Sequence, residues 1–120
     1  MVLVDTSIWI LHLRSANHTL IDLLRGARVA THPFIIGELA CGSLCQRKYF
    51  LELLSLLPQA KAASNQEVLG FIEEKKLYSQ GIGWIDAHLL ASARLSNIDI
   101  FTTDKSLAKV ATKLGIFYDV

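Results

Sequence analysis

The stretch Val2-Leu3-Val4-Asp5, at the start of the chain, is a short continuous apolar run that ends at a carboxylate. Such a run is typical of a parallel strand that is buried on both faces. A helical pattern follows it directly, over residues 6–14. This pairing of a strand with a helix is the first step of an alternation that continues along the chain.

The rest of the sequence repeats this alternation. Further strands are predicted over residues 29–31, 61–63, 100–102 and 116–118, and further helices over residues 19–25, 33–44, 47–57, 64–78, 85–97 and 105–114. Ser64 and Glu67 have the spacing of a capping box. Strands separated by helices favour a three-layer α/β/α fold, with a central parallel sheet of four to five short strands and helices on both faces.

The composition fits one small domain. Hydrophobic residues make up 52% of the 120 residues, enough for one core, and the length leaves no room for a second. We therefore predict a single domain over residues 1–120. Twelve Lys and Arg against eleven Asp and Glu give a net charge of +1. This balance excludes a charge-driven nucleic-acid coat and a polyacidic tail, but not a nucleic-acid enzyme.

Two features bear on the compartment. The apolar runs are too short to span a membrane, and the first residues lack the basic segment of a signal peptide, so we expect a cytoplasmic protein without membrane contact. Cys41 and Cys45 lie four apart in a predicted helix, a spacing that disfavours a disulfide, and no second pair completes a zinc site. We expect both to be buried, unreactive thiols.

Four acids stand out by position. Asp5 and Asp104 follow predicted strands, and ligands of open parallel sheets bind outside the carboxyl ends of the strands. Asp86 begins a helix behind a glycine-flanked loop, and Glu38 lies in an apolar helix where an unpaired carboxylate is costly. Singly, the three aspartates could be helix caps and Glu38 could face solvent. Together, they favour a functional site.

The context of these acids resembles a known family. Val4-Asp5-Thr6-Ser7, Glu38, Trp84-Ile85-Asp86-Ala87 and Thr102-Thr103-Asp104 resemble the signature of PIN-domain ribonucleases, in the family's order. The chain length and the N-terminal Leu3-Val-Asp-Thr-Ser-Ile-Trp9 are most similar to the toxin ribonuclease of VapBC toxin–antitoxin systems.

Several expectations follow from this resemblance. It implies that Asp5, Glu38, Asp86 and Asp104 are the catalytic, metal-binding acids. Thr6 and Thr102 match hydroxyls beside the site, and Ser7 and Thr103 match less closely. It also implies an RNA substrate, a homodimer, and a cognate antitoxin that covers the acidic groove, with DNA contacted only through the antitoxin.

The physical chemistry of four close carboxylates agrees with a metal site. Carboxylates that converge repel one another, and a hard divalent cation removes that conflict. Mg²⁺ prefers oxygen ligands and Mn²⁺ accepts the same set. We therefore expect hydrolysis of RNA by metal-activated water, for which the family implies 5′-phosphate and 3′-hydroxyl products.

Two alternatives compete with this interpretation. The first is an Asp-based phosphotransfer domain, either a receiver or a phosphatase of the haloacid-dehalogenase kind. Receivers carry adjacent acids after the first strand, which Asp5 lacks, and those phosphatases carry Asp-x-Asp where this chain has Ser7. The second is a non-catalytic PIN-like binding module, which the intact set of four acids disfavours.

Overall fold

One parallel sheet organises the chain in a computed structural model that describes residues 1–120. Its strands β1 (Val2–Val4), β2 (Val29–Ala30) and β3 (Asp99–Phe101) lie in the order β2-β1-β3. Both outer strands run parallel to β1, with Leu3 opposite Ala30 and Val4 opposite Phe101. The first apolar run of the sequence is therefore the central strand.

The sheet has three strands rather than four to five, and single residue pairs extend its two edges. Thr31 pairs with Gln59 beyond β2, and Ile100 pairs with Phe117 beyond β3. The strand predicted over residues 61–63 is wrong. After Gln59 the chain turns away from the sheet, because the backbone N–H of Lys61 donates to Ser96 Oγ at 2.7 Å instead of to a strand.

Seven helices complete the alternation. They are α1 (Thr6–Arg14), α2 (His18–Arg25), α3 (Pro33–Ala40), α4 (Arg47–Ser55), α5 (Asn65–Lys75), α6 (Trp84–Ser96) and α7 (Lys105–Lys113). The capping box of Ser64 and Glu67 is confirmed at the start of α5. The longest helix has 13 residues, and none has the length and apolar character needed to cross a membrane.

Helix α3 ends four residues earlier than predicted, at Ala40. The guanidinium of Arg47 reaches back and donates to the carbonyls of Ala40 and Gly42, which satisfies acceptors that a longer helix would have used. Cys41 and Cys45 consequently lie in an exposed turn. The prediction that both thiols are buried is wrong.

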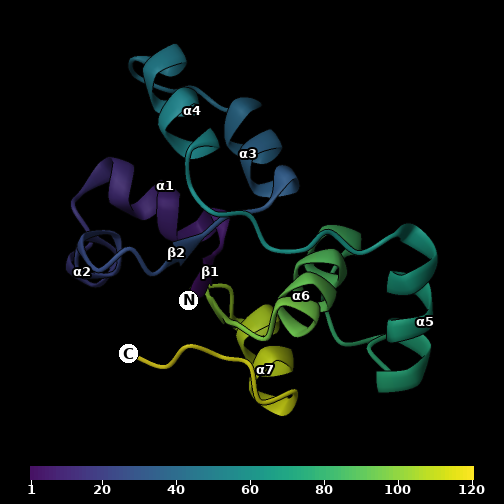
Figure 1. Cartoon of the computed structure of the whole chain (residues 1–120). Helices are drawn as coiled ribbons and strands as arrows, with labels where there is room; N and C mark the ends of the chain where they lie inside the picture. Colours follow the sequence, from purple (N-terminus) through teal and green to yellow (C-terminus); the bar gives the residue numbers. More distant parts are fainter.

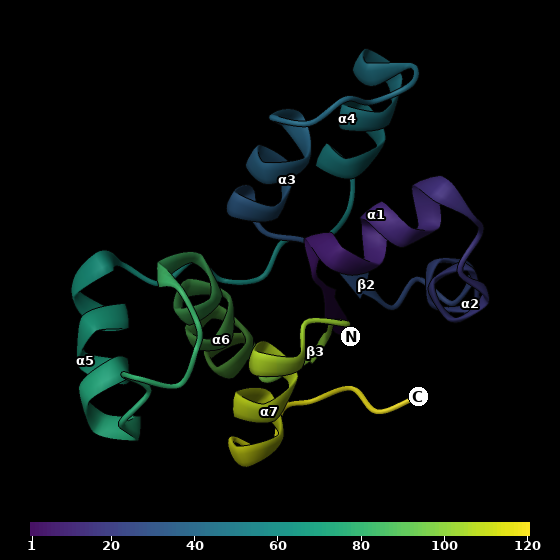
Figure 2. The same ribbon diagram turned by 180° about the vertical axis from the view of Figure 1, so that it is seen from behind.

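The helices lie on opposite sides of the strands. Two views related by a half turn place the sheet at the centre, with α1 and α2 on one side and α5 and α6 on the other (Figures 1 and 2). Helices α3 and α4 project as a pair from the body of the molecule (Figure 1). The predicted α/β class, with a parallel sheet between helices, is confirmed.

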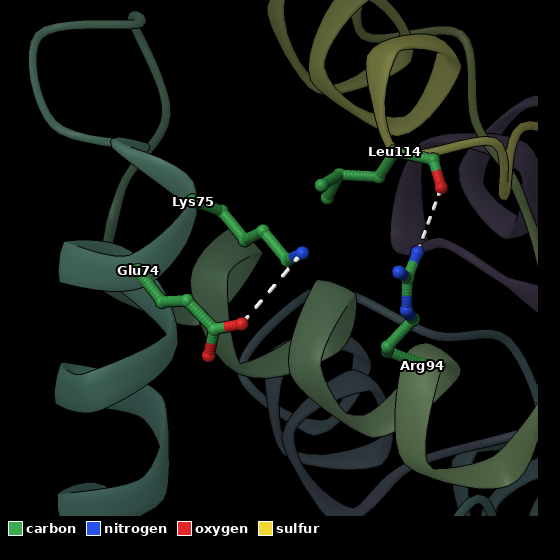
Figure 3. A network of polar contacts seen from close by, with 4 residues as sticks. All are labelled: Glu74, Lys75, Arg94 and Leu114. Carbon is green, nitrogen blue, oxygen red and sulfur yellow. Dashed lines mark hydrogen bonds and ion pairs between the residues drawn. The ribbon is translucent and has the colours of Figure 1, made fainter.

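Apolar packing fixes the strand ends from which the site is built. All three residues of β1 are at most 1% exposed, and they belong to a core of 22 buried residues. Helix α6 contributes Leu89 and Leu90, which are fully buried. At its far end, Arg94 donates to the carbonyl oxygen of Leu114 at 2.8 Å and ties α6 to the C-cap of α7 (Figure 3).

Candidate active site

The neighbouring strands β1 and β3 deliver Asp5 and Asp104 to one edge of the sheet. Asp5 follows β1 directly, is 8% exposed, and caps the N-terminus of α1. The Thr102 hydroxyl joins the two acids, because it donates to Asp5 Oδ2 at 2.8 Å and accepts the backbone N–H of Asp104 at 3.0 Å. Parallel pairing of Val4 with Phe101 therefore brings together residues almost a hundred positions apart.

Ser7 makes a second link between the same strands. Its hydroxyl donates to Asp5 Oδ2 at 2.8 Å and accepts the backbone N–H of Thr103 at 3.1 Å. Ser7, which the family signature matched less closely, thus contacts Asp5 as closely as Thr102 does. Thr103 contributes its backbone rather than its side chain.

Glu38 reaches the site from α3, which packs against α1. Its helix neighbours Ile35 and Leu39 are buried, but the Glu38 side chain is exposed. The Thr6 hydroxyl donates to Glu38 Oε1 at 2.9 Å, across 32 positions of sequence. The apolar surroundings that the sequence indicated therefore lie on the other side of α3, and the carboxylate faces the start of α1.

Asp86 lies at the third position of α6 and is half-buried. Burial raises the pKa of its carboxyl, and the negative charges of Asp5, Asp104 and Glu38 raise it further. The backbone N–H of Gly83, which donates to Asp86 Oδ2 at 3.2 Å, offsets part of this rise in pKa. The four predicted acids are therefore close enough to act on one another.

In each of the four carboxylates, one oxygen accepts a hydrogen bond from the protein and the other oxygen accepts none. The bonded atoms are Asp5 Oδ2, Glu38 Oε1, Asp86 Oδ2 and Asp104 Oδ1, the last of which accepts the Leu107 N–H at 2.9 Å. No Lys or Arg neutralises the group, since the chain's one ion pair joins Glu74 and Lys75. The protein therefore provides no ion-pair partner for these four negative charges.

This donor set suits a hard divalent cation, although no three of the side chains come close enough to coordinate one ion together. Mg²⁺ keeps several waters and needs only one or two carboxylates in direct contact. The other carboxylates would then act through water. Four anionic groups that each have a spare oxygen, and of which none forms an ion pair with Lys or Arg, fit such an ion.

Two surfaces next to the acids escaped the sequence analysis. A hollow of about 360 Å³ lies between α1 and the end of α3, and its lining includes Glu38, Ile10, Leu13 and Arg14. A row of rings also joins α3 to α6, formed by His32, Phe34, His88 and Trp84. Two signals in the sequence placed this row near the site: Phe34 lies one helical turn before Glu38, and Trp84 belongs to the motif that contains Asp86.

Comparisons with known proteins agree with the geometry. The model of the PIN domain family matches residues 2–113. The chain is 40% identical over 117 residues to Ribonuclease VapC32 of Mycobacterium tuberculosis strains CDC 1551 and H37Rv. The aligned residues cover 97% of this chain and 94% of those proteins.

A solved structure supports the same fold. The crystal structure of PAE2754 from Pyrobaculum aerophilum superposes with a TM-score of 0.59 at 19% identity, over 91% of this chain and 78% of the other. The match to the PIN domain model over residues 2–113 and the 40% identity to a ribonuclease set aside a receiver or phosphatase-like domain. The chain belongs to the PIN domain family and, within it, to the VapC ribonucleases, as the residues of its acidic signature predicted.

Proposed function

We propose that the chain is the endoribonuclease toxin of a VapBC-type toxin–antitoxin module and hydrolyses RNA phosphodiesters in an Mg²⁺-dependent reaction. One observation carries the proposal. Asp5 and Asp104 follow neighbouring strands, and the charges of both and of Glu38 act on Asp86; each of the four carboxylates has an oxygen without a protein donor, and none forms an ion pair. The 40% identity to a ribonuclease over nearly the full chain supports RNA as the substrate.

The residues divide into those that would hold the metal ion and those that orient them. Asp5 and Asp104 are our first choice for direct contact, because they extend from strand ends and are fixed by Thr102. Glu38 and Asp86 would bind the ion directly or through water. Thr6 and Thr102, together with Ser7, hold the bonded oxygens so that the free ones stay available.

The same arrangement would serve hydrolysis. A bound Mg²⁺, or Mn²⁺ in its place, would lower the pKa of a water and offset the charge on the leaving oxygen. Glu38 or Asp86 would accept a hydrogen bond from that water and orient it toward the phosphorus. The water oxygen would form the new bond to phosphorus as the bond to the 3′ oxygen breaks; the water would lose one proton and the 3′ oxygen would gain one, which yields the 5′-phosphate and 3′-hydroxyl ends.

A protein partner would inhibit this site from the adjoining hollow. Ile10 and Leu13 offer apolar contact there, and Arg14 offers a charge beside Glu38. We propose that a segment of the cognate antitoxin occupies this hollow and so covers the acids. We further propose a cytoplasmic homodimer that contacts DNA only through the antitoxin.

The decisive experiment is cleavage of total cellular RNA by purified, antitoxin-free protein, with mapping of new 5′ ends. We expect cleavage in Mg²⁺, none in EDTA, and none by Asp5→Asn, which preserves the shape of the side chain but removes its charge. Asp22→Asn is the matched control, because Asp22 is exposed on α2 away from the acids. Equal cleavage by Asp5→Asn and wild type, or cleavage in EDTA, would refute the proposed metal-dependent mechanism, and absence of cleavage by wild type in Mg²⁺ would leave the non-catalytic binding module.

A further inference from the structure

Two exposed aromatic rings lie beside the acids. Trp84 is 42% exposed and Phe34 is 37% exposed, whereas the chain's other tryptophan, Trp9, is 4% exposed in the core. Large apolar side chains gain most from leaving water, but Tyr49 and Tyr78 are exposed as well, so exposure alone identifies no site. Trp84 and Phe34 differ from those two residues because they lie on the helices that carry Asp86 and Glu38.

A buried histidine holds these two rings in place. The His88 ring lies 4.5 Å from Trp84 and 4.8 Å from Phe34, measured between ring centroids, and His88 is 2% exposed. The Trp84 and His88 rings meet edge to face, at 84°. Trp84 is thus fixed on one side and open on the other. An apolar hollow of about 180 Å³, with Tyr78 and Ile82 in its wall, adjoins its exposed part.

Both rings lie on helices that also carry an acid of the site, Glu38 on α3 and Asp86 on α6. Phe34 precedes Glu38 by four residues on α3, about one helical turn of 5.4 Å. Trp84 precedes Asp86 by two residues at the start of α6. Trp84 and Asp86 share the first turn of α6, so a planar group stacked on these rings would lie within about one helical turn of the two acids.

Charge gives a reason for stacking at this place. Unneutralised carboxylates repel phosphates, and a group of four cations lines a hollow at the carboxyl ends of α5, α6 and α7: Lys75, Lys76, Arg94 and Lys113. Proteins that bind single-stranded RNA gain affinity by stacking unpaired bases on aromatic side chains, independently of charge. A nucleobase is hence the planar group that fits an aromatic surface beside a phosphodiester site.

We infer that Trp84, supported by His88 and Phe34, is the stacking platform for an unpaired base adjacent to the scissile phosphate. This inference rests on the proposed function and deepens it. It assigns the recognition of one unpaired base to named side chains of α3 and α6. Duplex RNA would be excluded, because its bases are already stacked and cannot reach the ring.

The test compares kinetics on one unpaired RNA oligonucleotide that carries a mapped cleavage site. We expect Trp84→Ala to raise KM at least about fivefold, the lower limit for loss of one stacked base, with a smaller change in kcat. Trp84→Phe should recover most of the KM. Tyr49→Ala is the matched control, because Tyr49 is a 60% exposed aromatic residue on α4, and it should behave like wild type.

A second substrate separates stacking from a structural role. Replacing the base next to the cleaved bond by an abasic ribose should raise KM for wild type but not further for Trp84→Ala, since the two changes remove the same contact. Equal penalties in both proteins, or a wild-type KM for Trp84→Ala, would overturn the inference. So would a variant that loses only antitoxin affinity, because the platform would then bind protein.

Fluorescence provides a readout that needs no cleavage. Trp84 and Trp9 are the only tryptophans, and Trp9 is buried. A non-hydrolysable RNA analogue should quench the emission of wild type but not that of Trp84→Phe; equal quenching in both would count against the platform. Absence of RNA cleavage by wild type in Mg²⁺ would instead refute the proposed ribonuclease, an outcome seen before any variant is made.

Discussion

Helices α6 and α7 have an acidic end and a basic end, and the two ends differ in how their charges are satisfied. Asp86 and Asp104 lie at the amino ends, and Arg94 and Lys113 lie at the carboxyl ends. Both placements favour the helix, because the macrodipole attracts anions to the first turn and cations to the last. Helix stability alone thus accounts for the signs of these charges.

The two ends differ in the hydrogen bonds that their charged side chains make. At the basic end, Arg94 donates to the Leu114 carbonyl at 2.8 Å, and Lys113 donates to Gln80 Oε1 at 3.3 Å. Lys75, in the wall of the same hollow, lies 3.7 Å from Glu74 (Figure 3). At the acidic end, each carboxylate keeps one oxygen free and no cation approaches. Charges with protein partners stabilise the fold, and charges without them are available for a ligand.

The largest predicted difference between the ends is in cleavage. Asp104→Asn should lower the rate of RNA cleavage at least about a hundredfold, comparable to removal of one group that stabilises charge in a transition state. The fold should survive, because Asn also caps helices and the Leu107 N–H keeps its acceptor. The matched variant at the basic end, Lys113→Gln, should cleave like wild type.

Thermal unfolding tests the same contrast without RNA. Millimolar Mg²⁺ should raise the Tm of wild type and of Lys113→Gln by several degrees, because an ion that binds only the folded state stabilises it. For Asp104→Asn the rise should be smaller, and its Tm without metal should be unchanged or higher, since one of four repelling charges is gone. Equal metal-induced shifts in all three proteins would contradict the assignment of the free oxygens to a cation.

A smaller effect is expected from the basic end. Arg94→Met keeps much of the aliphatic stem but removes the hydrogen bond to the Leu114 carbonyl, which should lower the free energy of unfolding by about 1 kcal/mol. Chemical denaturation measures this loss. Lys109→Met, an exposed position on α7 without a side-chain partner, is the control and should change little. Loss of RNA cleavage by folded Arg94→Met would show that the basic end binds substrate and would break the comparison.

Local patterns in the sequence were sufficient for most of the fold. The run Val2–Val4, the capping box of Ser64 and Glu67, and Asp5 and Asp104 as helix caps all depend on residues a few positions apart. The errors come from side chains that bond the backbone of another segment, one of them 35 residues away and the other only five to seven. Residues 61–63 leave the sheet because Ser96 binds Lys61, and α3 ends early because Arg47 reaches back to its carbonyls.

The candidate site divides in the same way. Asp5 and Asp104 were predictable as neighbours, because parallel strands place their carboxyl ends on one edge. The bond between Thr6 and Glu38 and the rings around His88 depend on how α3 lies against α1 and α6, which no spacing in the sequence encodes. Glu38 and Asp86 stood out by their places in the sequence and the family signature joined them to the site, whereas their surroundings came from the structure.

The smallest predicted effect concerns the two buried histidines behind the acids. Burial lowers the pKa of His32 below its usual value near 6.5, and the nearby His88 lowers it further. As the pH falls below about 6.5, the unfolded chain takes up a proton that the folded chain resists, so stability is complete above that pH and declines below it.

His32→Asn keeps an acceptor for the Phe34 N–H at the start of α3 and should flatten this decline. The control is His18→Asn on exposed α2, which should leave the slope as in wild type. Denaturation between pH 5 and pH 8 measures the slopes, and an unchanged slope in His32→Asn would assign the acid sensitivity to other groups.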